Sequence, residues 1–290
     1  MADTTVLVNT GAVLSQTFTT DEATIDADGT VTVTVTNLAG GSVSGPATAT
    51  HVGAAGSGLY EWPLAPQAAP DVLRVVWSGT FGGVAQSLES SVEIVGGQYF
   101  TLYALRHADD QHSATPPLAD ANKWPNDLLR AARLEAEKEA MRIMGHSCVP
   151  RAARERMVAR RGVLHPSKAY VREIRAVTLA SDASTVDFSA WSIEGATSSW
   201  IRCGLADGTA VIVVYEHGED RVESDVSRAC VVRARHALAR YASQLPETTD
   251  RFQQIDGGGT LFLSQPTAKS TGNSYVDAVY GPHSTQVGFA

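Results

Sequence analysis

The sequence lacks the features that mark several common functional classes. It has no run of about 18 apolar residues that could cross a membrane. Its first residues, Met1–Thr5, show no basic segment followed by an apolar stretch, so we expect no signal peptide. The GxSxG, GxxxxGKS/T and GxGxxG motifs of hydrolase and nucleotide sites are also missing. These absences argue against a membrane protein and against the familiar enzyme families.

Cysteine is scarce. The chain has three, Cys148, Cys203 and Cys230, with no CxxC spacing. We interpret them as reduced structural thiols in a cytosolic setting. No His or Cys accompanies them at ligand spacing, and the eight histidines form no HxH or HxxxH pair, so no metal site is expected. We assign no catalytic residue and no cofactor, and we do not expect an enzyme.

Basic residues are almost missing from the first third of the chain. Residues 1–97 hold nine carboxylates and one basic residue, Arg74, while the whole chain has a formal net charge of −8. The entire acidic excess therefore belongs to residues 1–97. Segments of such different charge are expected to be separate domains, and the acidic one is a poor candidate for nucleic-acid binding.

Residues 1–97 show the pattern of a small all-β domain from Phe18 onward. Val31–Thr36 alternates valine with threonine, which places the valines on one face of a strand. Trp77 is expected in the core. Short strands between Gly, Pro and Ser are typical of an immunoglobulin-like (Ig-like) β-sandwich. The further predicted strands are Ala47–His51, Leu59–Trp62, Val72–Ser78 and Ser91–Val95.

Residues 98–119 are predicted to be a mobile or extended linker. A helix is expected to begin near Pro125 or Asp127, with Asn122 or Asn126 as its cap, and to end at Gly145. Apolar residues at helical spacing predict its buried face: Leu129, Ala132, Ala136, Ala140, Ile143 and Met144.

A second helix is expected from Pro150 to about Arg161, because proline suits a first helical position. The pattern returns to strands at about 168–216, with Asp207-Gly208 as a hairpin turn, and a long helix follows at about Ser224–Ser243. Residues 120–263 are thus interpreted as a helical domain with an inserted small β subdomain, and the whole chain as an α+β fold. The predicted strands of the insert are Tyr170–Val177, Trp191–Ile193, Trp200–Cys203 and Ala210–Tyr215.

Two polar groupings could carry function. Glu216, His217, Glu219 and Asp220 share one turn, which we interpret as a solvated strand-to-helix turn, with an active site as the alternative. Five arginines form the most basic stretch. They are either a solvated helix face, contacts to a neighbouring subunit or acidic partner, or phosphate contacts near DNA. These candidate inter-subunit or lumen contacts are Arg151, Arg154, Arg156, Arg160 and Arg161.

The last segment, 264–290, is rich in Ser, Thr, Gly and Pro and is interpreted as a C-terminal arm. Four apolar and aromatic residues interrupt it. They either pack against the same chain or dock on a partner's sheet edge or groove, and we prefer docking. These candidate docking residues are Tyr275, Val276, Val279 and Tyr280.

Four segments together resemble the head-to-tail adaptor (connector) proteins of long-tailed, actinobacterial bacteriophages. They are Trp124–Asp127, Val213–Gly218, Ser224–Tyr241 and the tail from Thr271-Gly272 to Asp277-Ala278-Val279. The resemblance implies a helical bundle that forms a twelve-fold ring between the portal and a tail-side neck protein, with the arm on the portal. It implies no catalytic residues, and DNA that passes through the ring without sequence-specific binding. The Ig-like domain and the β insert are additions to the minimal pattern.

The sequence thus leads us to expect a structural virion protein of the neck, at the head–tail junction, made in the host cytoplasm. The main alternative is a tail, baseplate or capsid-surface protein whose Ig-like domain binds host glycans or shell partners. A more distant alternative is a hydrolase with a site around His217.

Overall fold

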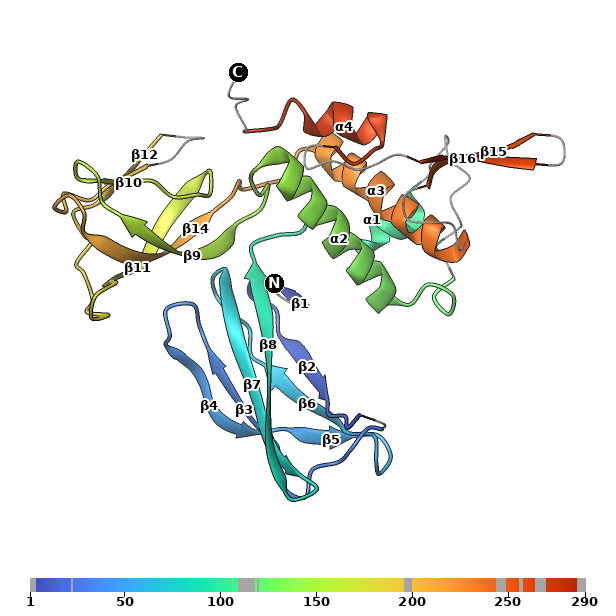
Figure 1. Cartoon of the computed structure of the whole chain (residues 1–290), viewed down its shortest axis with the longest axis horizontal. Coiled ribbons are helices and arrows are strands. Elements are labelled where there is room, and N and C mark those ends of the chain that lie inside the picture. Colours follow the sequence, from blue (N-terminus) through green and yellow to red (C-terminus); the bar gives the residue numbers. More distant parts are fainter. Residues whose placement is uncertain are drawn as a thin grey trace. The chain divides into compact units, whose positions relative to one another are not determined.

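The structure is a computed structural model that describes residues 4–21, 23–108, 118, 120–195, 200–243, 249–255, 258–263 and 270–285 (Figure 1). Between 240 and 263 it describes only the backbone. Strands and helices both occur and strands predominate, which confirms the α+β prediction at this level. No helix in the described part of the chain is long and apolar enough to span a membrane.

The chain divides into two compact units. Unit 1 comprises Met1–Gly97, Pro150–Ser167 and Val171–His217, and unit 2 comprises Gln98–Val149, Lys168–Tyr170 and Gly218–Ala290. The predicted boundary at residue 97 coincides with the end of the first segment of unit 1. The β insert belongs to the same unit as the N-terminal strands, whereas the sequence placed it within the helical domain.

Two sheets share one core in residues 4–95. One has the strand order β1-β8-β7-β3-β4 and the other β2-β6-β5, and the pairing of β1 with β8 is parallel. Phe18 and Phe81 stack in the core at 4.2 Å between ring centroids. The strands are β1 (Thr4–Leu7), β2 (Ala12–Thr17), β3 (Thr32–Thr36), β4 (Ser42–Thr48), β5 (Thr50–Val52), β6 (Leu59–Leu64), β7 (Asp71–Phe81) and β8 (Val84–Val95).

The alternation in β3 has the predicted effect. Val31, Val33 and Val35 are buried, and the threonines between them are only partly buried. Trp77 is buried in β7, as expected. The sequence missed β1 and β2, because the predicted β region began at Phe18.

The β insert contains two three-stranded antiparallel sheets, with orders β11-β14-β9 and β10-β13-β12, around a core of its own. The four predicted strands are present. The turn at Asp207-Gly208 also exists, but it is not a hairpin turn, because β13 and β14 on either side lie in different sheets. The strands are β9 (Arg151–Val158), β10 (Val163–Leu164), β11 (Val171–Leu179), β12 (Ser192–Glu194), β13 (Trp200–Arg202) and β14 (Ala210–His217).

The predicted second helix, Pro150 to about Arg161, is wrong. Residues Arg151–Val158 form β9, which pairs with β14 along its whole length, from Arg151 opposite His217 to Val158 opposite Ala210. Arginine, alanine, glutamate and methionine are good helix formers, so local propensity favoured a helix. Pairing with a strand far along the chain outweighed that propensity. The insert therefore begins at Arg151 and not near residue 168.

Unit 2 holds the helices α1 (Leu102–His107), α2 (Asn126–Met144), α3 (Ser224–Ser243) and α4 (Ser274–Tyr280), and a hairpin of β15 (Thr249–Ile255) and β16 (Gly258–Leu263). All six residues of the predicted α2 face are buried. Gly145 ends α2 in the left-handed conformation, as expected. The predicted asparagine caps are wrong, because Pro125 occupies the N-cap position without a side-chain hydrogen bond.

The predicted linker is partly folded. Tyr99 and Phe100, just before α1, and Leu105 within α1 belong to the same core as α2 and α3. The Tyr99 amide donates a hydrogen bond to the buried Glu137 carboxylate of α2 (2.9 Å). Residues 98–108 are therefore part of unit 2, while residues 109–117 and 119 of the predicted linker lie outside the described residues.

Candidate functional site

Three separate segments of unit 2 meet after the end of α2. They are the loop of residues 145–149, Lys168–Tyr170, and the pair Gly218-Glu219. The Glu219 amide donates to the Ser147 carbonyl (3.0 Å), and the Gly218 amide donates to the Tyr170 carbonyl (3.0 Å). These hydrogen bonds bring together side chains that are far apart in the sequence.

The backbones at this meeting point come so close that position 218 requires glycine. Gly218 has a φ of +103°, and a Cβ there would collide with the Val149 carbonyl oxygen. Tyr170, its hydrogen-bond partner, also has a positive φ of 56°, which is uncommon for a bulky residue. Tertiary contacts, and not local preference, therefore determine this geometry.

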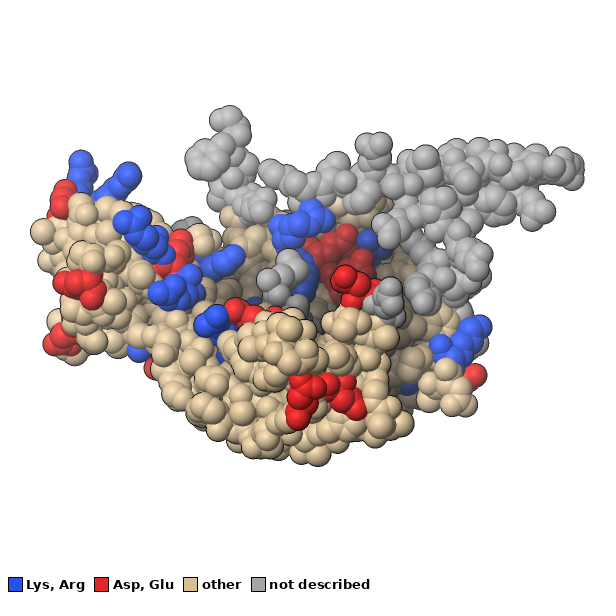
Figure 2. All heavy atoms as spheres, turned by 60° about the horizontal axis from the view of Figure 1, so that its bottom comes forward, with Lys and Arg blue, Asp and Glu red and all other residues tan. Residues whose placement is uncertain are grey.

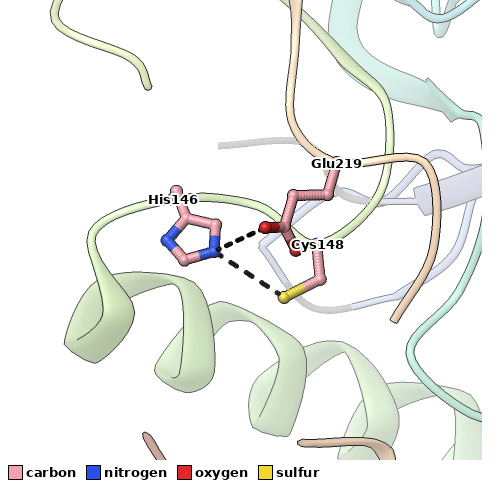
Figure 3. Close-up of side chains that lie close together, drawn as sticks. All are labelled: His146, Cys148 and Glu219. Atoms are coloured by element: carbon pink, nitrogen blue, oxygen red, sulfur yellow. Dashed lines mark hydrogen bonds and ion pairs between the residues drawn. The ribbon is translucent and has the colours of Figure 1, made fainter. Parts of the chain in front are cut away.

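The side chains of His146, Cys148 and Glu219 point toward one another here (Figure 3). His146 Nε2 lies 3.8 Å from Glu219 Oε1 and 4.0 Å from Cys148 Sγ. One donor atom from each residue lies within 4.8 Å of the other two. His146 and Cys148 are buried, and Glu219 is partly exposed. We call these three residues the HCE cluster.

The hydrogen bonding of the imidazole determines which nitrogen faces the cluster. His146 Nδ1 lies 3.3 Å from the carbonyl oxygen of Met144, which also accepts from the Thr285 amide. A carbonyl oxygen can only accept, so the proton of the neutral ring lies on Nδ1. Nε2 then presents its lone pair to Cys148 and Glu219.

Burial keeps the Cys148 thiol and the His146 ring uncharged. Burial, together with the nearby Glu219 carboxylate, raises the pKa of Cys148 to about 12. Burial also lowers the pKa of His146, against the opposing effect of Glu219. A cysteine nucleophile acts as its thiolate, so this arrangement does not activate Cys148 for nucleophilic catalysis. It offers one nitrogen, one sulfur and one oxygen donor, a set that suits a metal ion.

A second group of possible ligands lies at the start of α3. Glu223, Asp225 and His283 offer donor atoms within 4.8 Å of one another, but the two carboxylates are exposed. His283 Nε2 lies 3.1 Å from Asp225 Oδ2, and this hydrogen bond lowers the pKa of Asp225. Exposed groups of this kind need no metal ion to hold their positions, because water solvates their charges.

The five arginines do not form one surface. The Arg151 side chain is buried and pairs with Glu93 of β8 at 2.6 Å, so it is not available to a partner. The other four are exposed: Arg154, Arg156, Arg160 and Arg161. On the face drawn in Figure 2, several Lys and Arg side chains gather at the left, and Asp and Glu side chains lie among them.

The C-terminal docking prediction is wrong for two of its four residues. Val276 and Tyr280 of α4 are buried in the core of unit 2, and Val279 packs against it. The Tyr280 hydroxyl lies 3.1 Å from Cys230 Sγ in α3. Only Tyr275 is exposed, at 47%. The alternative, that this segment packs against the same chain, is therefore confirmed for α4, whose buried residues belong to the helical core.

The expected solvated turn near residue 217 is also wrong in part. Glu216 and His217 are buried at the end of β14. Glu216 forms ion pairs with Arg172 and Arg175 of unit 1, while Glu219 belongs to the HCE cluster in unit 2. The four polar residues therefore do not act as one group.

The prediction that no His or Cys accompanies the cysteines at ligand spacing is wrong, because His146 lies beside Cys148. They are two residues apart, directly after the glycine that ends α2, and this His-x-Cys pair was a visible signal for two ligands. The third member, Glu219, could be identified only from the structure. A comparison with protein-family models finds no matching family, and a comparison with curated proteins finds no significant relative.

Proposed function

We propose that this chain is a head-to-tail adaptor of a long-tailed bacteriophage, a non-enzymatic virion subunit that joins the portal to the tail. In this proposal unit 2 is the helical adaptor domain and residues 1–97 are an added Ig-like β-sandwich. Copies of the chain form a ring that meets the portal and a tail-side neck protein and conducts DNA. The order of helix α2, β insert, helix α3 and C-terminal segment supports the proposal.

One observation carries it: segments on which the resemblance rests meet in a single hydrophobic core. Trp124 before α2, Val226 in α3 and Val276 in α4 all belong to that core. Segments that share a core are one structural unit. An adaptor domain is expected to unite the same segments, so the packing of α4 favours this proposal even though it removes most of the expected free arm.

Because one face of α4 is buried, fewer of its residues are available to contact the portal. Tyr275 is the one exposed member of the docking set, and tyrosine is frequent among residues that dominate binding energy at interfaces. We therefore propose Tyr275, and not Val276 or Tyr280, as the portal contact. Arg154, Arg156, Arg160 and Arg161 are proposed to meet a neighbouring subunit, since ring interfaces join two different surfaces of the same chain.

The test mixes the purified full-length chain with the portal protein of the same virus, followed by mass photometry and cryo-electron microscopy. We expect a ring of this chain on the portal. Tyr275→Ala should weaken the complex at least about tenfold, the loss of about 1.4 kcal/mol at an interface. Tyr103→Ala is the matched control, because Tyr103 of α1 is also exposed, at 72%.

A chain that stays monomeric and unbound in the presence of the portal would overturn the proposal. In virions, density at the capsid surface or tail tip, in place of the neck, would do the same. That outcome, joined to binding of the full-length chain on a glycan array, would favour the alternative of a host- or shell-binding protein.

A further inference from the structure

We propose that His146, Cys148 and Glu219 bind one divalent zinc ion. This inference does not depend on the adaptor proposal. The HCE cluster combines imidazole nitrogen, thiolate sulfur and carboxylate oxygen, which are the three donor types that zinc takes from proteins. The three side chains converge from two segments on one point (Figure 3).

The spacing of the donor atoms is close to that of a tetrahedral zinc site. Zinc bonds of about 2.0 Å to nitrogen or oxygen and about 2.3 Å to sulfur hold neighbouring donors about 3.3–3.6 Å apart. His146 Nε2 lies 3.8 Å from Glu219 Oε1 and 4.0 Å from Cys148 Sγ. Side-chain rotations that shorten these two distances by about 0.4–0.5 Å bring them to tetrahedral values, and the third pair, Cys148 and Glu219, lies within 4.8 Å. The 3.8 Å separation is too long for a direct hydrogen bond.

The surroundings of His146 orient it as a ligand. Its Nδ1 faces the Met144 carbonyl, which is the outer hydrogen bond that metal-binding histidines commonly make. This leaves Nε2 for the ion. Tyr170 packs beside the imidazole, with 4.9 Å between ring centroids, and limits its movement. The Gly218–Tyr170 and Glu219–Ser147 backbone bonds hold the third ligand in place.

The position of the cluster allows the ion to cross-link two points of unit 2 that are far apart in the sequence. Between Val149 and Gly218 the chain belongs to unit 1, apart from the short return at Lys168–Tyr170, and the ligands lie on both sides of this excursion. A bond between these two points closes a long loop, which lowers the entropy of the unfolded chain. Binding converts the Cys148 thiol to a thiolate and releases its proton to solvent, while a water molecule completes the four ligands.

The first test measures zinc in the full-length chain. After treatment with a chelator and a reductant, we expect one zinc per chain by isothermal titration and elemental analysis, and a higher Tm with zinc than without. Cys148→Ser and Glu219→Gln should each weaken binding more than about tenfold. Cys203→Ser, a buried cysteine of unit 1, and Glu223→Gln, from the exposed group at α3, should leave it unchanged.

Cobalt provides a readout that needs no variant to fold. Co²⁺ added to the wild-type chain should give the absorption of a thiolate-to-cobalt bond, and zinc should abolish it. Either a wild-type chain that binds no zinc or a cobalt complex without thiolate absorption would overturn the proposal. So would loss of binding in Glu223→Gln with retention in Cys148→Ser, which would assign the ion to the other group.

Discussion

The Tyr280 hydroxyl and the Cys230 thiol lie 3.1 Å apart, and both side chains are fully buried. This contact joins α4, near the end of the chain, to the first half of α3. Burial raises the pKa of both groups, so both stay protonated at neutral pH. The C-terminal helix is therefore a component of the core of unit 2.

Removal of the Tyr280 ring should destabilise unit 2. We expect Tyr280→Ala to cost about 3–5 kcal/mol, as for other large core residues replaced by alanine. Tyr275→Ala, on the same helix but exposed, should cost less than about 0.5 kcal/mol. Urea unfolding followed by helical circular dichroism measures both, because every helix among the described residues belongs to unit 2. Equal costs for the two variants would contradict the packing of α4.

The buried pair of Arg151 and Glu93 should matter more than an exposed pair on the same strand. The two side chains are 5% and 14% exposed, so Glu93→Gln leaves a buried charge without its carboxylate. We expect a cost of about 3 kcal/mol and a fall in Tm of roughly 6–12 °C. Glu89→Gln is the matched control, because Glu89 of β8 pairs with Arg74 in solvent and should cost less than about 1 kcal/mol. The prediction fails if both changes lower the Tm equally.

Gly218 should be far less tolerant of a side chain than another glycine with positive φ. Gly218→Ala adds a Cβ against the Val149 carbonyl and should cost at least about 3 kcal/mol. Gly208 has a φ of +84°, and a Cβ added there would meet nothing within 4 Å. Gly208→Ala should therefore cost only the backbone strain of a positive φ, about 1–2 kcal/mol. Thermal unfolding compares them. The same cost at both positions would show that the close approach at Gly218 is relaxed in solution.

Asp277 should stabilise unit 2 in a pH-dependent way. Burial tends to raise the pKa of Asp277, but hydrogen bonds from Ser270 and Thr271 outweigh it and leave this pKa below its usual value. A carboxylate with a lowered folded-state pKa contributes stability above its unfolded pKa, near 3.9, and loses it as the pH falls through the folded value.

The measurement compares the unfolding free energies of wild type and Asp277→Asn between pH 7 and pH 2. We expect the wild type to be more stable at pH 7 and the difference to shrink below about pH 4. Asp127→Asn serves as the control, because the Asp127 side chain is 90% exposed and should show a small difference throughout. A difference for Asp277→Asn that stays constant down to pH 2 would refute the assignment.

Elements with strong local periodicity were predictable. The α2 face and the alternation of β3 follow from side-chain spacing of 3.6 and 2 residues, and burial of one face is enough to determine the element. Gly145 was also predictable as the end of α2, because its left-handed conformation favours glycine. These signals need no knowledge of the rest of the chain.

Elements that depend on a distant partner were not predictable. Arg151–Val158 has the residues of a helix, and only its pairing with β14 makes it a strand. The apolar residues of α4 were consistent with a free arm or with the core, because periodicity reveals a face but not what covers it. The HCE cluster likewise combines a local and a distant contribution. His146 and Cys148 are close in the sequence, whereas Glu219 is brought to them by the backbone contacts of Gly218.

Composition and periodicity were therefore sufficient to predict the acidic, all-β character of residues 1–97, the boundary that follows, and the two long helices, because both are local properties of the chain. Four features are visible only in the folded chain: β9 is a strand, Arg151 is buried against Glu93, α4 completes the core, and three possible metal ligands converge. Each of these depends on contacts between segments distant in the sequence, and their free energy outweighs the local preferences of the residues.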